Sequence, residues 1–294
     1  MILAPLRGVT IHTFRKVFAR PLMEYGFTEA FTPFITANPG LDPLKDRELR
    51  ASQENLSSQV VVTPQFIGKD PNSLRFCLER IKAAGYKMAD LNCGCPYPMV
   101  RNKLRGSGLL KTPDVLLKMI DVGCSVMGEG CFSIKTRLGI DCKDELLSLI
   151  SSINSFPLRF ITVHARTARQ MYDGECDMEA FNAIAKVAKV PIVYNGDAFV
   201  ENGCVRFPSS FDQGVKVSDV MIGRGFVCAL SERSDIDELL DNYINESLQE
   251  LCSERAVLGR MKELLAYWSD FPRWGRIWKV AKMSRNLEEF KLCL

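Results

Sequence analysis

The sequence predicts an α/β fold: an eight-stranded (β/α)8 TIM barrel followed by a small C-terminal all-helical domain. Three observations predict it. Short apolar runs alternate with longer amphipathic stretches, the chain has 294 residues, and residues 235–294 show helical periodicity without a clear strand. Repeated strand–helix units indicate a parallel sheet, and this length suits one closed barrel with a small appendage.

Eight apolar runs are expected to form the barrel strands. Most are apolar over several consecutive residues, as in strands that are covered on both faces. They are Ile2–Ala4, Phe27–Ala30, Gln59–Ile67, Ala89–Cys93, Phe132–Leu138, Phe160–His164, Ile192–Asn195 and Asp219–Ile222. Helices are expected between most of them, for example over Pro71–Ala84, Pro113–Met127 and Met178–Val187. An open doubly wound sheet is the alternative, but no Gly-x-Gly-x-x-Gly follows an early strand.

The pattern changes after Arg233, so residues 1–234 are assigned to the barrel and residues 235–294 to the helical domain. Two helices are expected there, because apolar residues recur at helical spacing. The first would bury Leu239, Leu240, Tyr243, Ile244 and Leu248, and the second Leu258, Met261, Leu264, Leu265 and Trp268.

Composition restricts the class of protein. With 47% hydrophobic and 25% charged residues, the chain should fold into a packed globule. No run of about 18 apolar residues predicts a membrane span, and the N-terminus lacks the pattern of a signal peptide. The 11 cysteines are odd in number, and neither a Cys-x-x-Cys pair nor a histidine cluster occurs. We therefore expect a cytoplasmic protein without a metal site or membrane partner. The protein is expected to act as a monomer.

Charge is unevenly distributed near the C-terminus. Residues 231–254 hold eight acidic residues against one basic residue, whereas residues 255–285 hold eight basic against two acidic residues. Such asymmetry is typical of a nucleic-acid-binding face, although two oppositely charged solvated helices would show it too.

Polar residues cluster where the predicted strands end, which is the active-site end of a barrel. Glycines in Asn195-Gly196-Asp197 and Gly223-Arg224-Gly225 follow the last two strands. They would let backbone amides approach a phosphate, although both are also ordinary turn sequences. Lys135 lies within an apolar strand. It is interpreted as an active-site cation, either stabilising negative charge or forming a Schiff base.

Three further side chains are candidates for ligand contact. His164 ends its strand, and Gln65 alternates with apolar residues; each is either a ligand contact or a satisfied core residue. Cys95 stands on a bend between Gly94 and Pro96. It could act as a nucleophile if its pKa were lowered, or as a proton donor if it remained a thiol. Cys93 is interpreted as an inert packing residue.

Taken in chain order, these motifs resemble the tRNA-dihydrouridine synthases of bacterial type. The similarity covers the whole barrel, and Asn-Cys-Gly-Cys-Pro joined to Gly-Ser-Gly-Leu-Leu is its most specific part. The matching segments are Leu3–Pro5, Asp90–Pro96, Gly106–Leu110, Lys135–Gly139, His164–Thr167, Asn195–Asp197 and Met221–Gly225. Leu6 and Arg7 depart from the usual family pattern, which has Met at the first position and often a small or acidic residue at the second.

The resemblance implies an FMN-binding catalytic barrel, NADPH as electron donor, and reduction of the 5,6 double bond of a D-loop uridine in tRNA. Cys95 would be the general acid, and residues 235–294 would bind tRNA. The residues implied at the flavin are Pro5, Leu6, Arg7, Gln65, Lys135, His164, Asn195, Gly196, Asp197, Gly223 and Arg224. Those implied at the flipped uracil are Asn92, Arg137, Arg166 and Tyr172.

Two features outside the motifs agree with an RNA partner. The loop after Cys95 carries four cations without an acidic residue among them: Arg101, Lys103, Arg105 and Lys111. The tail places Trp268, Trp274 and Trp278 among basic residues, where they either stack on bases or pack the helical domain.

Three alternatives remain open from sequence. They are a flavin barrel acting on a small molecule, as in dihydroorotate-dehydrogenase-like enzymes, a flavin-free aldolase using Lys135, and a non-catalytic RNA-binding relative.

Overall fold

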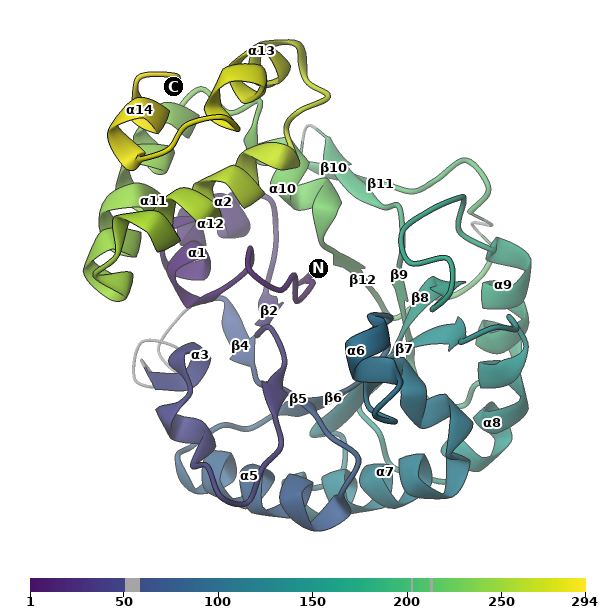
Figure 1. Cartoon of the computed structure of the whole chain (residues 1–294). Helices are drawn as coiled ribbons and strands as arrows, with labels where there is room; N and C mark the ends of the chain where they lie inside the picture. Colours follow the sequence, from purple (N-terminus) through teal and green to yellow (C-terminus); the bar gives the residue numbers. More distant parts are fainter. Residues whose placement is uncertain (51–58, 202, 212–213) are drawn as a thin grey trace.

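The computed structural model describes residues 1–50, 59–201, 203–211 and 214–294 and contains a central parallel sheet surrounded by helices (Figure 1). The parallel strands are β1 (Ile2–Leu3), β2 (Glu29–Phe31), β3 (Ile35–Thr36), β4 (Val61–Thr63), β5 (Gln65–Ile67), β6 (Ala89–Cys93), β7 (Phe132–Gly139), β8 (Ile161–Thr167), β9 (Ile192–Asn195) and β12 (Asp219–Ile222). A separate antiparallel hairpin consists of β10 (Phe199–Glu201) and β11 (Cys204–Arg206).

The sheet closes on itself. Its hydrogen-bonded order is β3-β5-β6-β7-β8-β9-β12-β1-β2-β4. The order ends at β3 and β4. Only Pro64 separates β4 from β5, which pairs with β3, and residues 32–34 join β3 to β2, which pairs with β4, so the two ends of the order are connected. Across the break, the Thr32 amide donates to Thr63 O at 3.1 Å, and the Gln65 amide donates to the Thr32 hydroxyl at 3.0 Å. When β2 with β3 and β4 with β5 are each counted as one strand, the ten segments form the eight strands of a (β/α)8 barrel, as the sequence predicts.

Most helices lie outside this ring (Figure 1). In chain order they are α1 (His12–Val17), α2 (Ala19–Glu24), α3 (Arg47–Arg50), α5 (Pro71–Ala83), α6 (Pro98–Arg101), α7 (Pro113–Met127), α8 (Glu145–Ile153), α9 (Met178–Val187) and α10 (Arg224–Leu230), with 3-10 turns at η1 (Pro43–Lys45) and η2 (Gly106–Lys111). Local sequence explains several boundaries. The Asp70 carboxylate caps α5 by accepting from the Ser73 amide at 2.8 Å, with Pro71 in the first turn.

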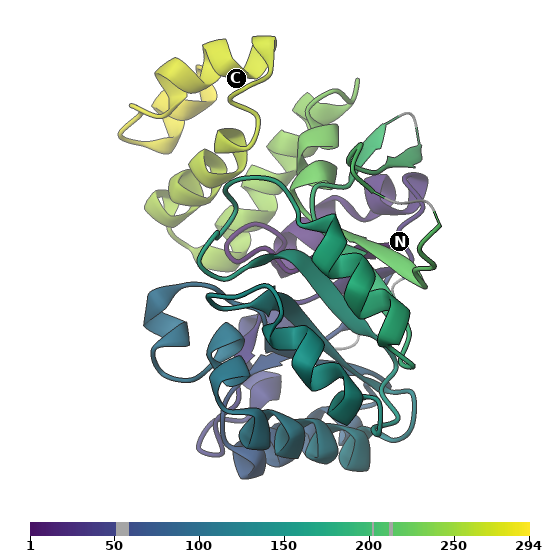
Figure 2. The same ribbon diagram turned by 90° about the vertical axis from the view of Figure 1, so that its right-hand side faces the viewer.

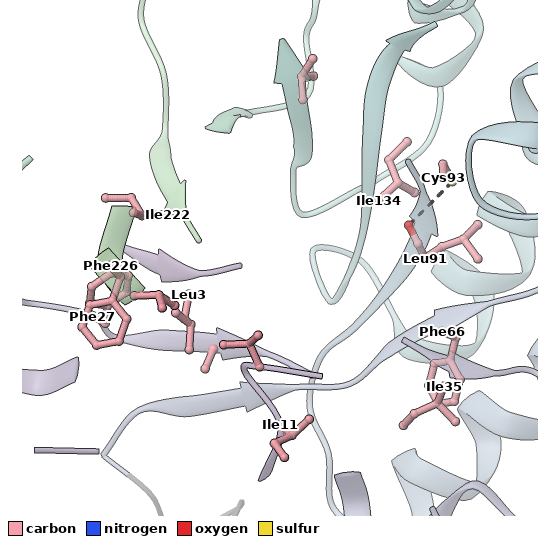
Figure 3. Packing of buried hydrophobic residues seen from close by; sticks show 14 of the residues in the cluster. Leu3, Ile11, Phe27, Ile35, Phe66, Leu91, Cys93, Ile134, Ile222 and Phe226 are labelled. Atoms are coloured by element: carbon pink, nitrogen blue, oxygen red, sulfur yellow. Dashed lines mark hydrogen bonds between the residues drawn. The ribbon is translucent and has the colours of Figure 1, made fainter. Parts of the chain in front are cut away.

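The pleat of each strand separates an outer apolar core from a polar interior. In β6, Leu91 and Cys93 pack outward among the buried residues drawn in Figure 3, and both are inaccessible to solvent. Asp90 and Asn92 alternate with them and face the inside of the barrel, where they are hydrogen-bonded to Gln65. The prediction that Cys93 is a packing residue is therefore confirmed.

Four helices follow the barrel and gather at one side of the molecule (Figure 2). They are α11 (Ile236–Leu251), α12 (Glu254–Ala266), α13 (Pro272–Ala281) and α14 (Leu287–Lys291). Nine of the ten residues predicted to line their apolar faces are buried, and Leu248 is partly buried. Trp268 and Trp274 are buried and join these helices to α10, since their indole N–H groups donate to Val227 O at 2.6 Å and Ser231 O at 2.9 Å.

These tryptophan contacts resolve one of the alternatives left by the sequence. Trp268 and Trp274 are packing residues, whereas Trp278 is partly buried. The acidic and basic segments near the C-terminus also form ion pairs with each other. Arg260 contacts Glu250 at 3.1 Å, and Arg273 contacts Asp237 at 2.5 Å.

The predicted strands and helices differ from the structure mainly at irregular points. The strand predicted over Phe27–Ala30 begins two residues later in the structure, at Glu29. The strand predicted over Gln59–Ile67 is interrupted at Pro64, which has no amide proton. The sequence does not predict strand β3 or the hairpin β10–β11, because segments of two or three residues carry no readable period. Among the described residues, no helix is long and apolar enough to cross a membrane.

Two glycine-to-alanine changes should affect stability in opposite directions. A Cβ at Gly123 of α7 would overlap the Phe132 ring, whereas a Cβ at Gly259 of α12 meets no atom within 4 Å. Overpacking should make Gly123→Ala lower the free energy of unfolding by about 1–3 kcal/mol. Gly259→Ala should raise it by about 0.5–1 kcal/mol through helix propensity. Urea denaturation of both variants measures this, and equal effects would contradict the packing described.

Candidate active site

A cavity of about 160 Å³ opens at the carboxyl ends of the barrel strands. Thirteen of the sixteen residues predicted for the site line it: Pro5, Leu6, Arg7, Asn92, Cys95, Lys135, Arg137, His164, Tyr172, Asn195, Gly196, Gly223 and Arg224. Gln65, Arg166 and Asp197 are not among the lining residues. The structure therefore brings most of the predicted site together, although these residues come from segments far apart in the sequence.

The bend that carries Cys95 is fixed by the side chain of Asn92. Asn92 Oδ1 accepts from the amides of Gly94 at 3.1 Å and Cys95 at 2.8 Å. Its Nδ2 donates to Gln65 Oε1 at 2.8 Å inside the barrel. The side-chain amide of Asn92 thus shapes the turn directly after β6, in addition to lining the cavity.

The Gly-Ser-Gly motif holds the same bend from the other side. Cys95 O accepts from the Ser107 amide at 3.1 Å and from the Ser107 hydroxyl at 2.9 Å. Gly106 has φ +57°, and a Cβ there would lie 2.7 Å from Cys95 Cβ. A Cβ at Gly108 would overlap Arg101 O. Gly106 therefore allows η2 to pack directly against the Cys95 bend, and Gly108 allows it to pack against α6.

The Cys95 thiol is held in its neutral form. The side chain is 7% exposed and lines the cavity. Burial raises the pKa of Cys95, and the positive charges of Arg137, Arg7 and Lys135 oppose that rise only in part. Of the two roles that the sequence left open, an uncharged proton donor fits this environment better than a thiolate nucleophile.

Lys135 and His164, in contrast to Cys95, have lowered pKa values. The Lys135 amine donates to Asn195 Oδ1 at 2.8 Å, and burial together with the nearby Arg137 charge lowers the pKa of Lys135 to about 7. Burial, and then the surrounding cations, also lowers the pKa of His164 well below its usual value. The imidazole is therefore neutral at physiological pH, so one ring nitrogen can donate a hydrogen bond and the other can accept one.

Arg137 connects two loops at the cavity rim. Its guanidinium donates to Gly94 O at 3.1 Å, Thr167 O at 2.9 Å and Met171 O at 2.6 Å. It also lies 5.3 Å from the centre of the Tyr172 ring. Arg137 thus positions the loops after β6 and β8 while remaining in contact with the cavity.

Asp197 pairs with two arginines at the end of β9. Arg166 Nη2 lies 2.6 Å from Asp197 Oδ2, and Arg224 Nη2 lies 3.1 Å from Oδ1. Arg166 also donates to Gly174 O at 2.6 Å and is 2% exposed. In this structure Arg166 and Asp197 support the cavity wall from behind, and their predicted ligand contacts stay predictions.

Several lining residues are not found by reasoning from the sequence. Pro33 and Phe34 follow β2, Tyr97 follows Cys95, and Glu263 and Tyr267 come from the C-terminal helices. Glu263 and Tyr267 are four residues apart at α12, which is the spacing of one helix face. That spacing is the available signal, but nothing local indicates that this face meets the barrel mouth.

Arg7 and Glu263 have opposite charges at the mouth. Arg7 is exposed and its guanidinium lies 5.7 Å from the centre of the Phe34 ring. Glu263 packs so closely on Gly8 that a Cβ there would lie 2.5 Å from Glu263 Oε2. Burial raises the pKa of Glu263, while Arg260 and Arg7 oppose that rise. The C-terminal helices therefore form part of the cavity wall.

A family model described as dihydrouridine synthase (Dus) matches residues 2–269. The chain belongs to the dihydrouridine synthase family. The match extends from β1 through α12, so it includes the helices that supply Glu263 and Tyr267. The resemblance inferred from the barrel motifs is confirmed.

Curated relatives in this family are named tRNA-dihydrouridine synthase B. The chain is 28% identical to that of Vibrio vulnificus (strain CMCP6) over 198 residues, which are 67% of this chain and 59% of the relative. It is 27% identical to that of Pasteurella multocida (strain Pm70) over 278 residues, which are 91% of this chain and 78% of the relative. The chain thus spans less than two thirds of the Vibrio relative's length.

Solved structures show the same barrel. An old yellow enzyme homologue from Zymomonas mobilis superposes with a TM-score of 0.54 at 12% identity, covering 78% of this chain and 85% of that one. Morphinone reductase gives a TM-score of 0.52 at 12% identity, covering 78% and 82%. At this identity the likeness concerns the fold alone.

Replacing Gly106 should disturb Cys95 specifically. Both Gly106→Ala and Gly130→Ala place a side chain at positive φ, which costs about 1–2 kcal/mol of stability. Only Gly106 lies against Cys95, because a Cβ at Gly130 meets no atom within 4 Å. If Cys95 moves outward, its pKa falls toward the usual value, so more thiolate is present at pH 8.

We therefore expect faster alkylation of Cys95 by iodoacetamide in Gly106→Ala than in Gly130→Ala, measured by peptide mass spectrometry. Equal rates in the two variants would count against the packing of η2 on Cys95.

Proposed function

We propose that this protein is a flavin-dependent tRNA-dihydrouridine synthase that reduces the 5,6 double bond of a D-loop uridine. One observation carries the proposal: a neutral thiol, Cys95, shares a cavity with a cluster of cations at the carboxyl ends of the strands. Family membership over residues 2–269 supports the same reaction. FMN is proposed as the cofactor and NADPH as the electron donor.

The donor set of the cavity fits a phosphate-bearing cofactor. Arg7, Lys135, Arg137 and Arg224 line it, whereas Glu263 is the single lining carboxylate among the described residues. Glycines follow β9 and β12 at Gly196 and Gly223, and a Cβ at Gly223 would come within 3.3 Å of the Leu6 side chain. Backbone that is free of side chains beside cations is the environment in which barrels hold phosphate groups.

When bound, the flavin would supply a hydride to carbon 6 of the uracil. Cys95 would then give its proton to carbon 5, which requires a thiol that is protonated at neutral pH. Arg137 lies at the rim beside Cys95 and would stabilise negative charge that develops on the uracil carbonyls. A base inside folded RNA reaches this cavity only after leaving its stack, so the uridine must be flipped out.

Tyr172 is well placed to meet a flipped base. The residue is 39% exposed, and its ring centre lies 5.3 Å from the Arg137 guanidinium and 4.9 Å from that of Arg224. Aromatic rings with adjacent arginines stack on unpaired bases. This arrangement supports the proposed role of Tyr172 in holding the uracil.

The proposed RNA partner would contact basic surfaces outside the cavity. Lys103 and Lys111 are exposed on the segment that follows Cys95, and Arg101 and Arg105 are partly exposed. We propose that residues 235–294 form a tRNA-binding domain and that the protein acts as a cytoplasmic monomer. The position of α12 at the cavity mouth supports the first of these proposals, since RNA entering the cavity must pass it.

An aldolase using Lys135 is the second candidate, because a pKa of about 7 would make its amine nucleophilic. A small-molecule flavin enzyme is the third. Successful reconstitution of the purified protein with FMN would count against the aldolase function. Salt-sensitive binding of unmodified tRNA would count against the small-molecule function.

The decisive experiment is mass spectrometry of tRNA from a strain that lacks this gene. Loss of dihydrouridine at one position, restored by the wild-type gene, is the expected result. Unchanged dihydrouridine would overturn the proposed function, and would instead favour a non-catalytic RNA-binding relative. A strain carrying only the Cys95→Ala gene serves as the control that separates catalysis from binding.

Cys95→Ala should separate the two half-reactions. Reduction of the tRNA uridine should be lost, because the proton donor is missing, whereas reduction of bound flavin by NADPH should survive. Stopped-flow absorbance of the flavin and mass spectrometry of the tRNA measure the two steps. Simultaneous loss of both steps in a folded, flavin-loaded variant would mean that Cys95 has another role.

Neutralising the basic loop should weaken tRNA binding in a salt-dependent way. Lys103→Gln with Lys111→Gln should reduce the slope of log Kd against log salt concentration by about one for each phosphate that the loop no longer neutralises. Lys189→Gln is the matched control, because Lys189 is exposed before β9 at the opposite end of the barrel. Electrophoretic shift at several salt concentrations measures the slope, and equal slopes for both variants would remove the loop from the interface.

A further inference from the structure

A chain of buried hydrogen bonds runs from the barrel interior to Cys95. Ser133 Oγ donates to Asp90 Oδ1 at 2.7 Å, and Gln65 Nε2 donates to Asp90 Oδ2 at 2.8 Å. Gln65 Oε1 accepts from Asn92 Nδ2 at 2.8 Å. The chain ends where Asn92 Oδ1 accepts from the Cys95 amide at 2.8 Å. Ser133, Asp90 and Gln65 are inaccessible or 1% exposed, so water cannot replace these partners.

The donors and acceptors in this series of hydrogen bonds can be arranged in only one order. The amides of Gly94 and Cys95 are donors, so Asn92 must turn its oxygen to them and its NH2 group toward Gln65. Gln65 must then accept from Asn92 and point its own NH2 group at Asp90. A reversed Gln65 would place two NH2 groups against each other, which leaves buried donors unsatisfied.

Asp90 and Ser133 keep this direction in either charge state of the carboxyl. Burial raises the pKa of Asp90 to about 8, so the carboxyl carries a proton for most of the time at neutral pH. Gln65 Nε2 cannot accept that proton's hydrogen bond, but the Ser133 hydroxyl can donate or accept. The proton is therefore held on the Ser133 side, and Asp90 Oδ2 remains an acceptor for Gln65.

We propose that Asp90 is a positioning residue for Cys95, acting through the oriented side chains of Gln65 and Asn92. This inference rests on the proposed function, because positioning matters catalytically only if Cys95 delivers a proton. Asp90 itself is not a cavity-lining residue and is inaccessible to solvent. Its effect is transmitted over three side-chain hydrogen bonds to the turn that carries the thiol.

The first test compares Asp90→Leu with Asp90→Asn in the flavin-loaded enzyme. Asp90→Leu removes the acceptor for Gln65, so kcat for uridine reduction should fall on the order of 100-fold. KM for tRNA and flavin reduction by NADPH should change far less, because neither uses the Cys95 thiol. Asp90→Asn should rescue most of the rate, because its oxygen can accept from Gln65 and its NH2 group can donate to Ser133.

Alkylation of Cys95 by iodoacetamide provides a readout that needs no tRNA. Asp90→Leu should raise the Cys95 rate about tenfold relative to the exposed Cys142 in the same molecule, because the bend opens more often. Glu29→Gln is the matched control. Glu29 is a buried carboxylate of the same barrel, but its hydrogen-bond partners are Arg159 and Thr63 rather than members of the chain that ends at Cys95.

A further variant pair covers the case in which Asp90→Leu does not fold. Ser133→Ala alone should keep kcat within about fivefold of wild type, since Asp90 can still accept from Gln65. Added to Asp90→Asn, it removes the acceptor for the new NH2 group, so the double variant should lose far more than the product of the single effects. Multiplicative effects would overturn the proposal.

The proposal is also overturned if Asp90→Leu keeps wild-type kcat and Cys95 alkylation, or if Glu29→Gln changes both as strongly. Absence of uridine reduction by the wild-type enzyme would instead overturn the proposed function. The alkylation rates would then still decide whether Asp90 positions Cys95.

Discussion

Alternate side chains of a pleated strand point to opposite sides of the barrel wall, and the site depends on this alternation in four neighbouring strands. In β6 it sends Asp90 and Asn92 inward, and the parallel register places them beside Ser133 and Lys135 of β7. His164 of β8 follows in register with Asn195 of β9. A one-residue slip in any of these strands would send its polar residues into the apolar core, where they would lack partners.

The polar interior explains why the cavity favours an anionic ligand. Burial and neighbouring cations lower the pKa values of Lys135, Arg137 and His164. The cavity therefore lacks enough negative charge to balance its basic side chains. A bound phosphate or a developing negative charge would relieve this shortage, and it would raise the same pKa values again. The thiol of Cys95 is affected in the opposite way, because burial dominates over the cations and keeps it protonated.

Much of the site could be predicted because strand ends are local features. The apolar runs locate β6, β9 and β12 with their observed bounds, and their carboxyl ends place Asn92, Cys95, Asn195 and Gly223 at one mouth. Side-chain pairing could not be predicted in this way. Nothing in the sequence around Arg166 indicates that it turns to Asp197, 31 residues later. The contribution of Glu263 is equally non-local, since it depends on how α12 packs across Gly8.

The position of Asp197 shows how a carboxylate can orient a cation at the cavity. Asp197 accepts from both Arg166 and Arg224. Arg166 is buried and donates to protein groups on either side of it, so it anchors the carboxylate. Arg224 donates to Asp197 through Nη2, while its side chain is 37% exposed and lines the cavity, so its other N–H groups can meet a ligand there. Asp197 therefore orients Arg224, and the arginine supplies the charge that an anionic ligand would meet.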